Sequence, residues 1–201
     1  MEDLGNLSYN NGKKCLVVSK KIIILGEGGT GKTTLLLRYT TGKFSEDTKM
    51  TVGSDFFVKK IKFEHGNCDV YLKLLLWDFA GEARFRFLLS DYTRGSDIIL
   101  VAFDLSRMKS IYHLVDWMEV LESARTYQNK TPIYLIGNKY DLVQKYQEPD
   151  YEYINKWIHD YHVSKYFETS SRTGYNVEEL FCDITRTLIE NSKQKASFLW
   201  I

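Results

Sequence analysis

The chain has 201 residues, and 44% of its side chains are hydrophobic. This length and composition allow one well-buried core, and the chain is too short for two ordinary domains. Its net charge of +1 excludes bulk electrostatic attraction to nucleic acid or to an anionic membrane as the basis of binding. Three cysteines without C-x-x-C spacing argue against a disulfide framework or a zinc site and favour a reducing compartment.

Apolar strand patterns and amphipathic helix patterns alternate along most of the chain. Residues 1–14 are polar and predict a flexible N-terminal extension, residues 15–191 predict a single α/β domain, and residues 192–201 predict a tail. No apolar run reaches the roughly 20 residues that cross a bilayer, so we expect a soluble protein. The expected strands are 15–25, 55–64, 69–78, 97–104, 132–137 and 165–168, and the expected helices are 31–41, 85–92, 110–127, 151–161 and 177–191.

This βαβ order predicts three layers, with a mostly parallel sheet of six strands and helices on both of its faces. One exception is local. Strands 55–64 and 69–78 are separated only by His65, Gly66 and Asn67, a hairpin connection, so one edge strand is expected to run antiparallel. Ligands of such sheets bind beyond the carboxyl ends of the strands, so the site is expected in the loops that follow them.

The first of these loops, Gly26 to Thr33, fits the phosphate-binding pattern G-x-x-x-x-G-K-[ST] between a strand and a helix. Its backbone N–H groups are expected to surround the phosphates, while Lys32 brings a full charge to the β- and γ-phosphates and Thr33 binds Mg²⁺. A glycine-rich turn that merely joins strand to helix is the alternative, which the intact pattern disfavours. The loop residues expected to contact the nucleotide are Gly28, Gly29, Thr30, Gly31, Lys32, Thr33 and Thr34.

Two further segments carry candidates for the terminal phosphate and the metal. Asp78 follows a buried strand and would reach Mg²⁺ through a water, and the N–H of Gly81 would bond the terminal phosphate. The segment 44–53 lacks periodicity and predicts a mobile loop. Its Thr51 would bind Mg²⁺ and the γ-phosphate only when that phosphate is present. Phe44 is a candidate for an edge-on contact with the base, with a core aromatic as the alternative.

The loops after the last two strands carry candidates for base recognition. Asp141 can accept two hydrogen bonds from the N1–H and the amine of guanine, a donor pair that adenine lacks on that edge. Lys139 can lie along the purine with its ammonium toward the phosphate loop, and Asn138 can tie the loops together. The alternative for each segment is an ordinary polar turn. The expected base-side residues are Asn138, Lys139, Asp141, Ser170 as a brace for Asp141, Ser171 as a donor to guanine O6, and Arg172.

Taken in this order, the segments resemble the Ras-like small GTPase superfamily over about residues 18–191, and the resemblance is closest to the Rab branch. Residues 51–56 are similar to T-I-G-V-D-F, residues 73–86 to K-L-Q-I-W-D-T-A-G-Q-E-R-F-R, and residues 92–96 to Y-Y-R-G-A. The resemblance implies the P-loop NTPase fold and a monomeric, cytoplasmic GTP/GDP switch in trafficking or signalling, which hydrolyses GTP with Mg²⁺.

The same resemblance implies protein partners. Effectors, exchange factors and GTPase-activating proteins are expected at two mobile loops, about 44–54 and 80–94, because these loops order against the γ-phosphate. Nucleic acid is not an expected partner. The last cysteine is Cys182, within an expected helix, so we expect no prenylation, and the apolar end at 198–201 is too short for a stable anchor. Any membrane contact would then depend on a partner.

One departure from the family concerns catalysis. Glu82 stands where the family carries its water-orienting glutamine, and with Lys32, Thr51 and Gly81 it forms the expected catalytic set. An ionised carboxylate accepts a hydrogen bond from water but donates none to the transferring phosphoryl group, and it adds negative charge beside the γ-phosphate. We therefore expect slow intrinsic hydrolysis, unless Glu82 is protonated and acts as a donor.

Two alternatives of other classes remain open at this point. The first is a GTP-binding scaffold with little or no turnover, which differs from the switch in rate and not in fold. The second is an adenine-nucleotide kinase or ATPase, which is disfavoured because Asp141 selects guanine.

Overall fold

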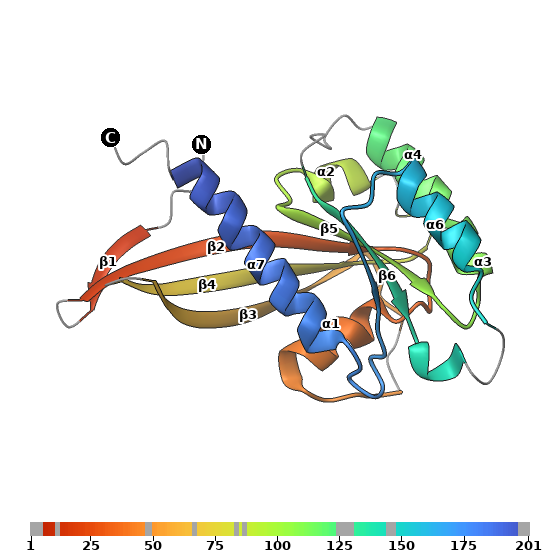
Figure 1. Ribbon diagram of the computed structural model, residues 1–201, viewed down its shortest axis with the longest axis horizontal. Coiled ribbons are helices and arrows are strands. Elements are labelled where there is room, and N and C mark those ends of the chain that lie inside the picture. Colours follow the sequence, from red (N-terminus) through yellow and green to blue (C-terminus); the bar gives the residue numbers. More distant parts are fainter. Residues whose placement is uncertain are drawn as a thin grey trace.

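A central sheet with helices on both faces dominates the computed structural model (Figure 1). The structure describes residues 6–10, 13–46, 50–65, 68–82, 85, 88–123, 131–143 and 148–196. The strands are β1 (Asn6–Asn10), β2 (Lys13–Leu25), β3 (Ser54–His65), β4 (Cys68–Phe79), β5 (Ile98–Asp104), β6 (Ile133–Asn138) and β7 (Lys165–Glu168). The helices are α1 (Lys32–Thr41), α2 (Leu89–Thr93), α3 (Lys109–Tyr112), α4 (Leu114–Ser123), α6 (Tyr151–Asp160) and α7 (Val177–Ala196), with the 3₁₀ turn η2 (Tyr140–Leu142).

The sheet has the order β3-β4-β2-β5-β6-β7, and β1 pairs with β2 outside this path. Strands β4, β2, β5, β6 and β7 run parallel, while β3 pairs antiparallel with β4 at the edge. This confirms the predicted six strands with one antiparallel edge strand. After β2 the chain first builds one side of the sheet and then the other. The carboxyl end of β2 is therefore the point where ligands of such sheets bind.

Two buried clusters fill the space between the sheet and its helices. Alternate residues of β2 divide between them, because successive side chains of a strand point to opposite faces. Ile22 and Ile24 belong to the cluster that includes residues of α1 and α7. Ile23 and Leu25 belong to the cluster that includes residues of α2, α3, α4 and α6. Each fully buried side chain of this size contributes about 1.5–3 kcal/mol, so β2 is anchored on both faces directly before the phosphate loop.

The first strand differs from expectation. Asn6–Asn10 pairs antiparallel with β2, from Asn6 opposite Val17 to Asn10 opposite Lys13, so the prediction of a flexible extension over 1–14 is wrong for this segment. The polar composition suggested an extension, but Leu7 and Tyr9 alternate with polar residues, which is a strand pattern. The hairpin of β1 and β2 lies at the end of the molecule away from α3 and α6 (Figure 1).

Three predicted helices also have different limits. The helix expected over 110–127 is two helices in the structure, α3 and α4, separated at His113, and residues 124–130 lie outside the described part. The buried positions Ile111, Leu114 and Trp117 keep helical spacing across the break, so periodicity does not reveal it. The helix expected over 85–92 is only α2, and α7 continues to Ala196, into the predicted tail. Residues 197–201, including the apolar end, lie outside the described residues.

Candidate nucleotide site

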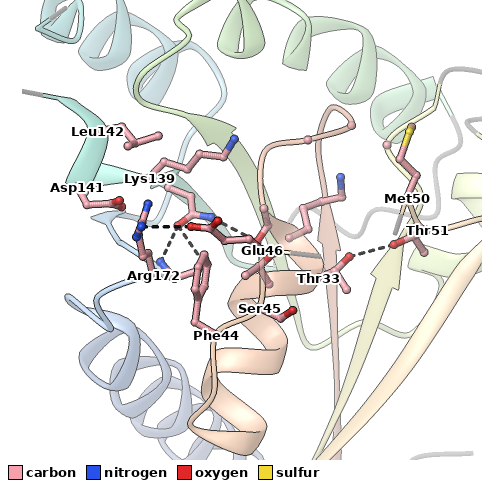
Figure 2. A pocket seen from close by; sticks show the side chains of 18 residues that line it. Thr33, Phe44, Ser45, Glu46, Met50, Thr51, Lys139, Asp141, Leu142 and Arg172 are labelled. Atoms are coloured by element: carbon pink, nitrogen blue, oxygen red, sulfur yellow. Dashed lines mark hydrogen bonds and ion pairs between the residues drawn. The ribbon is translucent and has the colours of Figure 1, made fainter. Parts of the chain in front are cut away.

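The loops at the carboxyl ends of β2, β4, β6 and β7 meet around a cavity of about 300 Å³. Figure 2 shows Phe44, Glu46, Lys139 and Arg172 on one side of it and Thr33 and Thr51 on the other. The predicted residues that line this cavity are Gly28, Gly29, Gly31, Lys32, Thr33, Thr34, Phe44, Thr51, Gly81, Asn138, Lys139, Asp141, Ser171 and Arg172. Thr30, Asp78, Glu82 and Ser170 are not among the lining residues.

The phosphate loop has a backbone that only glycine allows at its first residue. Gly26 has φ 135°, and a Cβ there would lie 2.1 Å from the carbonyl oxygen of Ala102 in β5. Gly31 has φ 87°, and a Cβ there would lie 2.5 Å from the side-chain nitrogen of Asn138. The two ends of the loop are thus packed against β5 and the end of β6.

Lys32 lies almost fully buried at the centre of the loop, with 6% of its surface exposed. Its Nζ donates to the carbonyl oxygens of Gly26 at 2.8 Å and Glu27 at 2.9 Å. Burial lowers the pKa of Lys32 to about 8, and the nearby carboxylates of Asp78 and Glu27 oppose this shift. A bound phosphate would favour the charged form further, so the cavity provides a cation whose charge is stabilised by an anionic ligand.

Thr33, Thr51 and Asp78 form an oxygen-rich corner beside Lys32. Thr33 Oγ1 donates to Asp78 Oδ2 at 2.5 Å, Thr51 Oγ1 donates to the same oxygen at 3.2 Å, and the two hydroxyls are 2.9 Å apart. Asp78 is fully buried, and its Oδ1 has no hydrogen-bond partner among the described residues. Burial raises the pKa of Asp78, while the Thr33 hydrogen bond and the Lys32 charge oppose the rise.

This corner fits Mg²⁺. Hydroxyl and carboxylate oxygens are the hard ligands that Mg²⁺ prefers, and Mg²⁺ usually completes its shell with waters and substrate phosphates. A divalent cation would also satisfy the orphan oxygen of Asp78. Within the described ranges no group of three His, Cys, Asp or Glu residues has metal-binding geometry, so an all-protein metal cage is not present there.

Asn138 joins the loops on the base side. Its amide donates to the carbonyl oxygens of Thr30 at 3.0 Å and Gly31 at 3.3 Å, while its oxygen accepts from Thr169 and Ser171. The structure therefore places Asn138 as predicted, between the phosphate loop and the loop after β7. A single buried side chain holds three loops in register.

Neighbouring side chains also hold those of Asp141 and Lys139 in place. Ser170 donates to Asp141 Oδ1 at 2.6 Å, which is the predicted brace. Lys139 differs in part from expectation, because its ammonium pairs with the buried carboxylate of Asp104 at 2.8 Å. Its stem still lies near the phosphate loop, with Cε 3.9 Å from where a Gly31 Cβ would be.

Phe44 and Glu46, which follow α1, lie over the base side of the cavity. Phe44 is half-buried and lines the cavity, and it belongs to neither hydrophobic cluster. Glu46 Oε1 pairs with Arg172 at 3.2 Å (Figure 2). Both partners are more than half exposed, so this pair adds little stability.

Comparison with known proteins decides the family. The Ras family model matches residues 21–190. Three relatives cover 89% of this chain and 86% of their own length: GTP-binding protein yptV5 of Volvox carteri, 34% identical, Ras-related protein RABG3f of Arabidopsis thaliana, 35% identical, and Ras-related protein Rab7A of Mesembryanthemum crystallinum, 36% identical. The chain belongs to the Ras family.

This Ras-family protein is a small GTPase of the Rab type: it binds guanine nucleotide, hydrolyses GTP to GDP and phosphate, and acts as a molecular switch. The predicted family and fold are confirmed. Regulators and effectors of some kind follow from family membership. None of the described helices has the length and apolar character to span a bilayer.

Several residues of this Ras-family site were not predicted from the sequence. Those that line the cavity are Ser45, Glu46, Met50 and Leu142. The first three lie in or beside a loop without periodicity, and no spacing rule marks which of its side chains face inward. Outside the cavity, Arg107 contacts the phosphate loop with no sequence motif to announce it.

Proposed function

We propose that this protein is a Rab-type switch in membrane trafficking whose cavity holds GTP or GDP together with Mg²⁺. The observation that carries the proposal is the corner where Thr33, Thr51 and Asp78 meet within 2.5–3.2 Å beside the buried ammonium of Lys32. It supplies positive charge for phosphates and hard oxygens for the metal at one place.

The roles of the residues follow from their chemistry. The phosphate-loop N–H groups and Lys32 bind the phosphates, and Thr33 and Thr51 provide hydroxyl ligands while Asp78 acts through a water. When bound, Mg²⁺ would neutralise charge that develops on the transferring phosphoryl group. Glu82 would accept a hydrogen bond from the attacking water but, when ionised, would donate none. Slow intrinsic hydrolysis is the consequence that we expect.

Base selection rests on Asp141, Ser171 and Lys139. Ser170 holds Asp141 through Oδ1, and Asp141, Lys139 and Ser171 all line the same cavity. Guanine offers Asp141 two donors and offers Ser171 the O6 acceptor, whereas adenine reverses the polarity of that edge. A site with buried polar groups rejects a base that leaves them unpaired.

We assign effector binding to a surface that includes Phe56 of β3, Trp77 of β4 and Tyr92 of α2. Phe56 packs edge-on against Trp77 with ring centroids 5.1 Å apart, and Trp77 packs against Tyr92 at 5.8 Å. Ser54 donates to the hydroxyl of Tyr92 at 3.1 Å, which joins the two loop regions. A change at Thr51 or Gly81 when the γ-phosphate is lost would therefore reach this surface. We further propose that the protein works as a monomer and reaches membranes through a partner.

Thermal unfolding with added nucleotide tests the base and the site together. We expect GDP with Mg²⁺ to raise the unfolding temperature and ADP to leave it unchanged, because a ligand that binds only the folded state stabilises it. Asp141→Asn should remove most of the GDP effect, since its amide places a donor opposite guanine donors. The exposed Asp160→Asn is the matched control and should keep the full effect. Equal stabilisation by ADP would contradict the proposal.

A further inference from the structure

Arg107 contacts the phosphate loop from outside the cavity. It lies in the turn between β5 and α3, and a guanidinium nitrogen donates to the carbonyl oxygen of Gly28 at 3.2 Å. The same nitrogen lies 3.9 Å from where a Gly29 Cβ would be. Gly28 and Gly29 line the cavity and Arg107 does not. The guanidinium therefore meets these two glycines on the side of the loop that is away from the ligand space.

Two carboxylates flank the guanidinium. Glu27 Oε2 lies 3.3 Å from Arg107, and Glu27 Oε1 lies 3.0 Å from Nδ1 of His113 at the end of α3. Asp104 lies 4.0 Å from Arg107 Nε, and it is itself fixed by Ser106 at 2.6 Å and by Lys139 at 2.8 Å. Arg107 is thus part of a chain of alternating charges that runs from the phosphate loop to the base-recognition loop.

The geometry of the peptide bond turns this contact into a directional effect. No cis peptide bond occurs in the described backbone, so the C=O of Gly28 and the N–H of Gly29 point in opposite directions across one planar unit. Because Arg107 holds the oxygen outward, the Gly29 N–H is directed to the cavity side. A hydrogen bond from a charged donor also polarises the peptide and strengthens the donor at its other end.

We propose that Arg107 is a positioning residue for the bound phosphates, which orients and polarises the Gly28–Gly29 peptide so that the Gly29 N–H is a preformed, strengthened donor. The inference rests on the proposed nucleotide site and adds a residue that acts through the loop and not on the ligand. Glycine at both positions makes the peptide free to rotate, so an external restraint has a large effect on it.

The sequence allows this one peptide to be observed alone. Gly28 and Gly29 are the only adjacent pair among the 13 glycines. In protein labelled with [1-¹³C, ¹⁵N]glycine, an HNCO spectrum therefore contains a single peak, which reports the Gly28 carbonyl carbon and the Gly29 amide proton. In the GDP·Mg²⁺ complex, we expect Arg107→Ala to move both shifts upfield, because the carbonyl loses its donor and the amide proton loses polarisation. Arg107→Lys should give an intermediate shift.

Kinetics supply the second readout. We expect GDP to dissociate about tenfold faster from Arg107→Ala, which corresponds to the loss of one charge-assisted hydrogen bond. Lys109→Ala removes the same charge from an exposed position two residues further along, and it should change neither the peak nor the rate. A purely structural role would lower the unfolding temperature of Arg107→Ala and leave the peak in place.

The outcomes separate this inference from the proposed function. If the unaltered protein binds GDP but its peak is unchanged by both Arg107 substitutions, the positioning role is overturned while the nucleotide site stands. If Lys109→Ala shifts the peak as much as Arg107→Ala, general electrostatics replaces the specific contact. If the unaltered protein binds no GDP, the nucleotide site fails and this inference fails with it.

Discussion

Asp78 and Lys32 are both buried, and each makes the other's ionised form tolerable. Burial raises the pKa of Asp78 and lowers that of Lys32 to about 8, while each charge opposes the shift of the other. Lys32 uses its ammonium to hold the loop carbonyls of Gly26 and Glu27. These two hydrogen bonds hold the ammonium at the centre of the phosphate loop.

The proton balance of Lys32 has a definite sign. Its pKa is lower in the folded protein than the ordinary value of 10.5, so the folded state binds fewer protons than the unfolded state between about pH 8 and 10.5. Burial of this charge therefore costs stability below about pH 8, and the cost is relieved as pH rises through this range. A ligand phosphate reverses the balance, because it favours the protonated form.

Glu82 carries the prediction on turnover. We expect Glu82→Gln to hydrolyse GTP faster than the unaltered protein, because an amide accepts a hydrogen bond from water and also donates one to the phosphoryl group. A gain of about a hundredfold would match the addition of one such donor. Single-turnover measurement of phosphate release checks this.

The control for this experiment is the exposed Glu152→Gln, which should leave the rate unchanged. An equal or faster rate in the unaltered protein would show that Glu82 supports hydrolysis and does not slow it.

At the scale of elements, the chain directly after β4 contacts the phosphate loop at Gly81. A Cβ at Gly81 would lie 2.2 Å from the backbone nitrogen of Gly28 and 2.5 Å from the carbonyl carbon of Glu27. These atoms are backbone and cannot turn aside as a flexible side chain would. Only glycine allows this approach, and the phosphate loop therefore limits where the loop after β4 can lie.

Gly81→Ala should separate GTP binding from GDP binding. The added methyl group displaces the loop and removes the N–H that we assign to the terminal phosphate, so we expect the preference for GTP over GDP to fall about tenfold. Competition between the two nucleotides checks this. Gly95→Ala is the control: its φ of 71° makes alanine cost about 1 kcal/mol of stability, but open space surrounds it and the preference should stay. An unchanged preference in Gly81→Ala would contradict the assignment.

The elements around the site were predictable where a pattern has one meaning. All seven residues of β5 are buried, and such an apolar run fits a central strand of a parallel sheet. The phosphate loop combines spacing, strand and helix in one segment. The pairs Glu46–Arg172 and Arg107–Gly28 join loops far apart in sequence through flexible side chains, and no periodicity encodes such contacts.

At the scale of the whole molecule, β1 gives the sheet a seventh strand. It pairs with residues 13–17 of β2, while β5 pairs with residues 22–25 of the same strand. Strands β1 and β5 therefore pair with different ends of β2. Asn11-Gly12 between two strand patterns is a sequence pattern typical of a hairpin. The polar composition of residues 1–14 instead led us to predict an extension.

Removal of residues 1–10 tests the independence of the two ends of β2. We expect a loss of about 1–3 kcal/mol in the free energy of unfolding, because a few backbone hydrogen bonds are lost at about 0.5–1.5 kcal/mol each. Urea unfolding checks the loss. The GDP dissociation rate should be unchanged, since β4 and β5 hold the end of β2 that carries the phosphate loop. Faster GDP release would show that the hairpin supports the site.

The pairing of β2 with β4 makes insertions unequal along the chain. Eleven consecutive pairs, from Lys14 opposite Cys68 to Ile24 opposite Asp78, set how far Thr33 lies from Asp78. An extra residue before Lys13 only lengthens the hairpin. An extra residue between Val18 and Leu25 turns the apolar faces of the strand over and moves Thr33 along the sheet by about 3.3 Å. The length of β2 therefore determines where Thr33 lies relative to Asp78.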